Sequence, residues 1–294
     1  MYVIAGATGR VGSAVARSLL AAGAEVRVLV RRRTDADVWE ARGAQANVIA
    51  LDDRTGVAGA LKGCAGFFVL LPFDLTVDDL EAHADRLIAS IAGAVVDARV
   101  PHVVVLSSGG ADLAAGTGPI AGLHRLEEAL LATGTTMTAL RSGHFQEKVA
   151  DVLDVARDSG VYPVFAATAD VAHPMVATAD LGAVAAEALL APPDPGEAVD
   201  VIGPAYSEQE VAAALGVALG RELHVAPLPR DAWQGALTDA GFRPHIAEAL
   251  AELYRADEQG LLAPRGDRSV RVHTPVETTI DLLVAARSRR GSWS

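Results

Sequence analysis

The first twenty residues hold an apolar run, a glycine-rich turn and a helical stripe, in that order. Tyr2 to Ala5 are apolar enough for a short buried strand. The glycines that follow are Gly6, Gly9 and Gly12. Val11, Val15 and Leu19 then recur at four-residue spacing, which predicts one face of a helix. The chain is therefore expected to begin with a strand, a tight turn and a helix.

This order is typical of the unit that binds a dinucleotide. The helix start offers unpaired N–H groups and a partial charge of roughly +0.5, which suits a diphosphate. Gly6 permits the sharp turn, Gly9 lets the backbone approach the diphosphate, and Gly12 lets the helix lie close to the strand. The other turn residues expected to contact a cofactor are Thr8, Arg10 and Val11. The alternative is a plain strand-to-helix turn that is merely rich in glycine.

A basic cluster follows the second expected strand, Glu25 to Val30. It consists of Arg31, Arg32 and Arg33, about 20 residues past the glycines, where an NAD site usually places an acid. Guanidinium groups match phosphate geometry, so the ribose 2′-phosphate of NADP is the expected partner, and Arg10 could join them. Each charged hydrogen bond is worth roughly 1.5–3 kcal/mol, enough to favour NADP over NAD. The alternative is a solvated basic loop.

Composition narrows the class of protein. The formal net charge of −12 over 294 residues argues against nucleic-acid or anionic-membrane binding as the main task. No apolar run of about 18 residues is present, and no charged leader precedes the first strand, so neither a membrane span nor a signal peptide is expected. Cys64 is the sole cysteine, which fits a reducing cytoplasm. The oligomeric state has no signal in the sequence.

Apolar runs and helical stripes alternate over residues 1–142. This pattern predicts an α/β fold, a Rossmann-type doubly wound parallel sheet, followed by a smaller, mostly helical part in which the alternation loosens. The expected core is 1–143 with 176–203, and the expected lid is 144–175 with 204–294. Further strands are expected at 48–51, 66–71, 102–106 and 137–140, with a strong helix at 75–98.

Ligands of such sheets bind beyond the carboxyl ends of the strands. The residues that follow those ends are therefore candidate cofactor contacts. They are Leu51, Asp52, Leu71, Pro72, Phe73, Ser107 and Gly143. Asp52 or the Leu51 backbone would contact adenine.

Several motifs together resemble the NmrA-like branch of the atypical short-chain dehydrogenase/reductases. The most specific are Gly6–Gly12, Leu106–Gly109, Leu123–Gly134 and Met137–Glu147, and the likeness continues through Val176–Gly182 and Val201–Pro204. The resemblance covers nearly the whole chain and implies a Rossmann core with a lid over a substrate cleft. It implies NADP binding more firmly than any reaction, because the family includes both reductases and cofactor-sensing regulators.

The chain departs from the family's relatives at the usual acid. Reductases of this superfamily pair a tyrosine acid with a lysine that holds the nicotinamide ribose, four residues further on. Here no tyrosine occurs between Tyr2 and Tyr162, and Arg125 stands where related reductases keep a lysine. Arginine can bind ribose but is a very poor proton donor near neutral pH. The usual proton relay is therefore missing.

Three residues are the candidate catalytic groups. His124 lies on the helix that normally carries the acid, and His144 follows the strand that should pass beside the nicotinamide. Either imidazole could protonate an oxyanion. The resemblance suggests that Ser108 holds a carbonyl oxygen. The alternative for His124 is a surface residue without a catalytic role. A further route needs no side-chain acid, because an activated quinone or extended enone can take its proton from water.

The expected substrate side combines aromatic and histidine residues near the lid. They are His144, Phe145, Tyr162, Phe165, His173 and Trp233, although each alone is more often a packing residue. Glu127 falls on the apolar face of its helix, so a buried ion pair with Arg141 is expected. No spacing of metal ligands is found, so no metal site is expected.

Two functions of different classes fit these observations. One is an NADPH-dependent reductase of a small conjugated carbonyl, quinone or polyketide-like compound, and the other is a non-catalytic NADP(H)-sensing regulator. The missing tyrosine and lysine favour the sensor, whereas a complete lid with histidine candidates favours the reductase. An epimerase or dehydratase ranks third, because it depends most on the absent acid and base.

Overall fold

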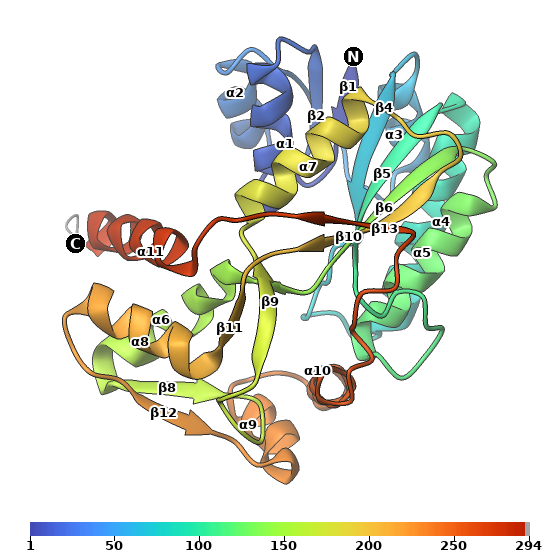
Figure 1. Cartoon of the computed structure of the whole chain (residues 1–294). Coiled ribbons are helices and arrows are strands. Elements are labelled where there is room, and N and C mark those ends of the chain that lie inside the picture. The colour runs from blue at the N-terminus through green and yellow to red at the C-terminus, as the bar shows by residue number, and fades with distance from the viewer. Residues whose placement is uncertain (292–294) are drawn as a thin grey trace.

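The computed structural model of the chain describes residues 1–291, and its centre is one sheet of eight parallel strands (Figure 1). The strand order is β13-β10-β6-β5-β4-β1-β2-β3. Their bounds are β1 Tyr2–Ile4, β2 Val26–Val30, β3 Gln45–Val48, β4 Gly66–Leu70, β5 His102–Ser108, β6 Thr136–Ser142, β10 Glu197–Ile202 and β13 Arg268–Arg271. Because the order reverses beside β1, the sheet has the switch point at which doubly wound sheets bind nucleotides.

Helices cover both faces of this sheet. One face carries α1 (Arg10–Ala21), α2 (Arg33–Glu40) and α7 (Thr178–Leu190), and the other carries α3 (Arg54–Leu61), α4 (Leu80–Ala98) and α5 (Ala121–Leu131). Helices α1 and α7 pack closely, because a Cβ added at Gly182 would lie 2.3 Å from that of Ala14. The expected doubly wound parallel fold is confirmed.

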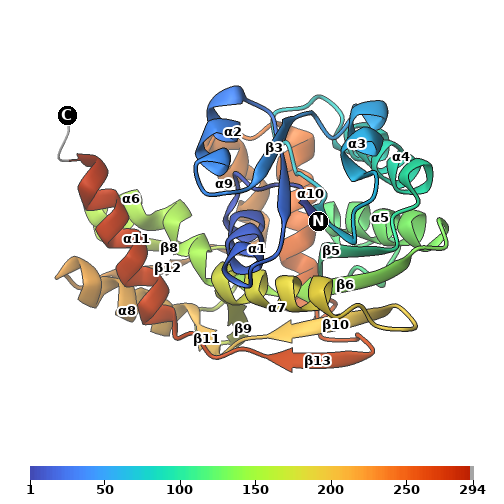
Figure 2. The same cartoon turned by 90° about the horizontal axis from the view of Figure 1, so that it is seen from above.

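The lid lies at one end of the sheet (Figure 2). It contains a three-stranded sheet, β11-β9-β7, and a two-stranded sheet, β12-β8. These strands are β7 His144–Phe145, β8 Val161–Val164, β9 Ala172–Val176, β11 Ala205–Ser207 and β12 His224–Pro227. The helices of the lid are α6 Val149–Ser159, α8 Glu208–Leu219, α9 Trp233–Asp239, α10 Pro244–Glu258 and α11 Val276–Gly291. The described residues also form the short 3-10 helices η1 Gly118–Ile120, η2 Gln146–Lys148 and η3 Arg230–Ala232.

A separate apolar core holds much of this region together. It includes Leu153 of α6, Tyr162 of β8, Leu215 of α8 and Ile280 of α11. The spacing of Ser207 and Glu210 predicts a capping box at the start of α8, and the box is present: Ser207 accepts from the Glu210 N–H, and Glu210 accepts from the Ser207 N–H. The lid therefore folds on its own hydrophobic cluster rather than as an extension of the sheet.

Three details differ from the sequence-based expectations. Residues 268–271, expected in the lid, form the edge strand β13; their sequence Arg-Ser-Val-Arg is too polar and short to predict a strand. The strand expected at 48–51 is β3, which covers residues 45–48 and ends at Val48. This segment is a half-exposed edge strand without a continuous apolar run, so apolar residues do not mark its bounds. The helix from 75 begins only at Leu80, where Asp79 accepts from the Ala82 N–H.

Asp180 is a fourth difference. The sequence favours this acid as the cap of the helix that ends at Leu190, but α7 begins two residues earlier, at Thr178, with Ala177 in the cap position. Asp180 instead accepts hydrogen bonds from the N–H and hydroxyl of Thr274. Residues 292–294 of the expected lid lie outside the described residues.

Candidate functional site

The turn between β1 and α1 is built so that only glycine fits. Gly6 has a φ of +69°, and a Cβ there would lie 2.6 Å from the Leu70 side chain. A Cβ at Gly12 would lie 2.3 Å from the carbonyl oxygen of Gly6. Thr8, Gly9 and Arg10 are exposed, and α1 begins directly at Arg10 with Gly9 at its cap. The first N–H groups of α1 thus face an open surface that a diphosphate fits, while Val11 is buried against the core.

The three arginines after β2 are all exposed, but they are not equivalent. Arg32 pairs with Asp35 at 2.8 Å. Arg33 pairs with Asp37 at 2.8 Å and also contacts Glu40. Within residues 1–291, Arg31 has no ion-pair partner, and neither has Arg10. Because bound acids compete with a phosphate, Arg31 and Arg10 are the cations best placed to bind one.

The remaining cofactor candidates are spread over the sheet edge. Leu51 is half-buried and Asp52 is exposed beyond β3, while Leu71 is buried. Pro72, Phe73 and Arg125 line a cavity of about 340 Å³ beyond β4, where Arg125 pairs with Asp85 at 2.9 Å. Gly143 instead lines a second, larger cavity.

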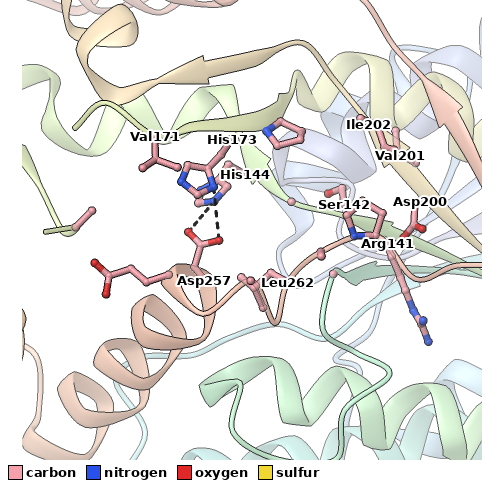
Figure 3. Close-up of a pocket in the computed structure, with 18 of the residues that line it drawn as sticks. Arg141, Ser142, His144, Val171, His173, Asp200, Val201, Ile202, Asp257 and Leu262 are labelled. Carbon is pink, nitrogen blue, oxygen red and sulfur yellow. Dashed lines mark ion pairs between the residues drawn. The ribbon is translucent and has the colours of Figure 1, made fainter. Parts of the chain in front are cut away.

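That larger cavity, of about 570 Å³, lies beyond the carboxyl ends of β6 and β10, against the lid (Figure 3). Its apolar wall includes Val171, Ile202 and Leu262. The loop that carries Leu262 is close to the end of β5, since a Cβ at Gly109 would lie 2.2 Å from the Leu262 carbonyl oxygen. The space is therefore enclosed by core residues on one side and lid residues on the other, as a substrate site requires.

Two of the predicted histidines meet an aspartate at this cavity. His144 Nε2 lies 3.0 Å from an Asp257 carboxylate oxygen, and His173 Nδ1 lies 3.9 Å from the other oxygen. The two imidazole centroids are 5.2 Å apart. Burial raises the pKa of Asp257, but the hydrogen bond from His144 and the nearby positive charges outweigh burial, so the pKa is lowered from its ordinary value.

These three side chains place their ligand atoms within 4.8 Å of one another, a cluster that no sequence spacing predicted. Such a group can hold a cation or share a proton. Here the 3.0 Å contact commits His144 Nε2 and Asp257 to each other, which favours a shared proton.

The other catalytic candidates lie elsewhere. His124 Nδ1 donates to the Ala111 carbonyl at 2.9 Å, and His124 is not among the residues that line the two cavities. The Ser108 hydroxyl is directed at the Ser142 carbonyl, at 3.3 Å. Of the three candidates, only His144 lines the larger cavity.

Most aromatic candidates pack inside the lid or against the core. Tyr162 donates its hydroxyl to Glu208 at 2.7 Å, and Trp233, fully buried, donates its indole N–H to the Leu228 carbonyl. Phe165 stacks on Tyr254. Phe145 packs against the sheet core. None of these four lines the larger cavity. A lid this small needs Tyr162, Phe165 and Trp233 for its own packing, and Phe145 is used at the sheet core.

The expected buried pair of Glu127 and Arg141 is confirmed. Arg141 Nη2 lies 2.5 Å from one carboxylate oxygen, and the Ser107 hydroxyl donates to the other at 2.5 Å. The hydrogen bond with Glu127 raises the pKa of Arg141 above its ordinary value. Ser107, predicted as a cofactor contact, is thus committed to this pair, and the Arg141 guanidinium points away from the cavity (Figure 3).

The residues that complete the cavity carry no local signal in the sequence. Helix α10 ends with two adjacent acids, Asp257 and Glu258, and no neighbouring residue in the sequence distinguishes Asp257 from a solvent-exposed acid. Val171 and Leu262 come from loops far from His144 along the chain. Only the packing of the lid on the core brings them to the ends of β6 and β10.

The parallel sheet, the glycine turn at its switch point and the lid define a dinucleotide-binding protein of Rossmann type. The chain belongs to the NmrA-like family, whose profile matches residues 2–280. It is 29% identical over 258 residues to the NAD(P)H azoreductase of Xenophilus azovorans, covering 86% of each chain.

Two solved structures share the fold. A triphenylmethane reductase of Citrobacter sp., solved with NADP(H), matches with a TM-score of 0.80 at 20% identity over 96% of this chain and all of its own. An NADPH-dependent quinone oxidoreductase of Escherichia coli, solved with NADPH, matches with a TM-score of 0.76 at 21% identity over the whole of both chains. No helix described for residues 1–291 has the length and hydropathy to cross a bilayer.

Proposed function

We propose that this protein is an NADPH-dependent reductase of small conjugated acceptors such as quinones or azo compounds. The observation that carries the proposal is the position of the larger cavity. It opens beyond the carboxyl ends of β6 and β10, on the same edge of the parallel sheet as the β1–α1 turn. A cofactor that starts at the turn and crosses this edge would present its far end to the cavity. The azoreductase relative and the two reductases of the same fold support this reaction class.

The residues at the turn would hold the cofactor. The N-terminus of α1 suits the diphosphate, and the glycines keep the backbone free of side chains there. Arg31 and Arg10 would bind the 2′-phosphate, because both are exposed cations that form no ion pair among residues 1–291. Leu51 and Asp52 would lie at the adenine, and Arg125 at a ribose.

Bound NADPH would supply a hydride from its nicotinamide ring. The protein's part is to hold a flat acceptor in the cavity and to exclude water from it. Val171, Ile202 and Leu262 offer an apolar wall for that purpose, and His144 lies beside it. In this proposal residues 1–143 with 176–203 and β13 bind the cofactor, and the lid closes the substrate cavity.

The alternative function is a sensor that binds NADP(H) without turnover. The enclosed cavity with paired histidine and aspartate favours the reductase, since a sensor has no need of a proton donor there. The test is to titrate the full chain with NADPH and NADH by calorimetry and to follow NADPH oxidation with a quinone, an azo dye and a cationic triarylmethane dye. We expect tighter binding of NADPH and turnover of at least one acceptor. Tight NADPH binding without turnover of any acceptor would favour the sensor.

A further inference from the structure

His144 and Asp257 form an ordered pair at the wall of the cavity, from two different parts of the lid. His144 comes from β7, directly after the core strand β6, and Asp257 from the end of α10. Their side chains are only 25% and 22% exposed, and the 3.0 Å contact holds the imidazole at Nε2 (Figure 3). In residues 1–291 no hydrogen bond is formed by His144 Nδ1. One nitrogen is thus fixed by an acid, and the other is available.

A carboxylate in this position has two effects on an imidazole. It fixes the ring orientation and it stabilises the protonated form, as in other histidine–aspartate pairs. Asp257 remains charged, because the positive groups around it lower its pKa despite burial. His173 is the second imidazole on the same carboxylate, 3.9 Å from it. The other charged groups around the cavity are Lys148 of η2, Arg230 of η3, Glu258 of α10, and Arg141 and Asp200 at the ends of β6 and β10.

Building on the proposed function, we propose that His144, positioned by Asp257, donates a proton to the acceptor, and that the site therefore favours acceptors whose hydride adduct is a strong base. An azo group is such an acceptor. One nitrogen gains the hydride and its electron pair, the N=N π bond breaks, and the other nitrogen takes the proton of His144. The product of this two-electron step is a hydrazine. The imidazole is then neutral and regains its proton from solvent.

A cationic triarylmethane dye provides the contrast. Its central carbon is electron-deficient, so a hydride alone converts it into the neutral leuco form, and no proton is needed. A variant that lacks only the proton donor should lose azo reduction and keep dye reduction. A variant with a damaged cofactor site or fold should lose both. The two acceptors thus separate proton donation from every earlier step.

The experiment compares His144→Asn, Asp257→Asn and the control His224→Asn, a change to an exposed histidine of β12 that does not line the cavity. Steady-state rates are measured with methyl red and with malachite green, in the presence of EDTA. Loss of general acid catalysis costs roughly 10²–10⁴-fold. We expect kcat for methyl red to fall at least about 100-fold in H144N, less in D257N, and not in H224N. Malachite green rates should fall far less than methyl red rates in H144N and D257N, because this dye needs no proton, and they should stay within about 3-fold in H224N.

A second measurement does not depend on turnover. Long-range ¹H–¹⁵N spectra of the full chain with labelled histidine report which ring nitrogen carries the proton, and the H144N spectrum assigns the His144 signals. We expect the wild type to carry a proton at Nε2 both when Nδ1 is protonated and after Nδ1 has given up its proton, and we expect a clear change of the His144 signals in D257N. Melting temperatures and NADPH affinities of the variants show whether each is folded.

Several results would overturn the inference. One is an equal loss of rate with both dyes in a folded H144N, and another is no loss of the methyl red rate in that variant. A wild type that reduces malachite green but not methyl red would also overturn it, as would His144 signals that do not change in D257N. A wild type that reduces neither dye nor a quinone would contradict the proposed reductase itself. The two failures are therefore distinguishable.

Discussion

Glu127 of α5 and Arg141 of β6 form a buried ion pair, with 6% and 11% of their side chains exposed. The guanidinium donates through both Nε and Nη2, and the Ser107 hydroxyl completes the set of donors to the carboxylate. The pair links the ends of two core strands to the helix between them. Arg141 is also one of the residues that line the larger cavity, so the pair helps to hold one part of the cavity wall in place.

Removal of one partner should therefore destabilise the protein. Glu127→Ala leaves a buried guanidinium without its acid, which costs about 3–5 kcal/mol. The free energy of unfolding in urea should fall by that amount. The matched control is Glu128→Ala, because Glu128 is the exposed neighbour on the same helix, and we expect a change within about 0.5 kcal/mol. Equal stability of the two variants would contradict a structural role for the pair.

The arginines should differ in their effect on cofactor affinity. Arg31→Ala removes a cation that forms no ion pair in residues 1–291, whereas Arg33→Ala removes one that is already paired with Asp37 and Glu40. Loss of one charged hydrogen bond should weaken NADPH binding by roughly 10- to 150-fold in R31A. NADH affinity should change little, and R33A should bind NADPH almost as the wild type does. Calorimetric titration measures the affinities of R31A for NADPH and NADH and the affinity of R33A for NADPH. An unchanged NADPH affinity in R31A would exclude Arg31 as the phosphate ligand.

The glycine turn gives a prediction that joins stability to binding. Gly12→Ala places a Cβ 2.3 Å from the Gly6 carbonyl oxygen and 2.9 Å from that of Ala5. Helix α1 must then move from β1, so we expect a lower melting temperature and at least a 10-fold loss of NADPH affinity, a cost of about 1.4 kcal/mol. The control is Gly59→Ala in α3, an exposed helical position where an added Cβ meets nothing within 4 Å. That variant should be neutral or more stable by roughly 0.5–1 kcal/mol.

Asp257 should make stability depend on pH. Its pKa in the folded protein is lowered, so its contribution to stability is complete above the pKa of the unfolded chain and is lost as pH falls through the folded value. The wild type should therefore be more stable than Asp257→Asn near pH 7, and the difference should shrink as the medium is acidified towards pH 3. Urea unfolding at a series of pH values measures this difference. A constant difference over the whole range would mean that the carboxylate charge has no such role.

The parts of the fold that the sequence predicts are those with local signals. The apolar strands near 66–71, 102–106 and 137–140, the glycines of the first turn, and the Ser207–Glu210 capping box each specify their conformation within a few residues, and each is present in the structure. The Glu127–Arg141 pair was predictable as well, because an acid on an apolar helix face needs a partner.

The remainder depends on contacts between distant segments. Strand β13 has two arginines in four residues and becomes a strand only because β10 offers a free edge. Asp257 and His144 meet through the docking of α10, which no local pattern encodes. Tyr162 and Trp233 are of residue types that often contact substrates, but in this lid both side chains are buried in its interior.

The most direct test of the account is whether hydride passes from NADPH to an acceptor on this protein. Malachite green is reduced in two parallel reactions, one with (4R)- and one with (4S)-deuterated NADPH, labelled at C4 of the nicotinamide. The molecular mass of the leuco dye is then measured by mass spectrometry. The account predicts leuco dye heavier by one mass unit with one of the two forms and unlabelled dye with the other. Unlabelled leuco dye from both forms, or no reduction of any acceptor by a protein that binds NADPH tightly, would contradict it.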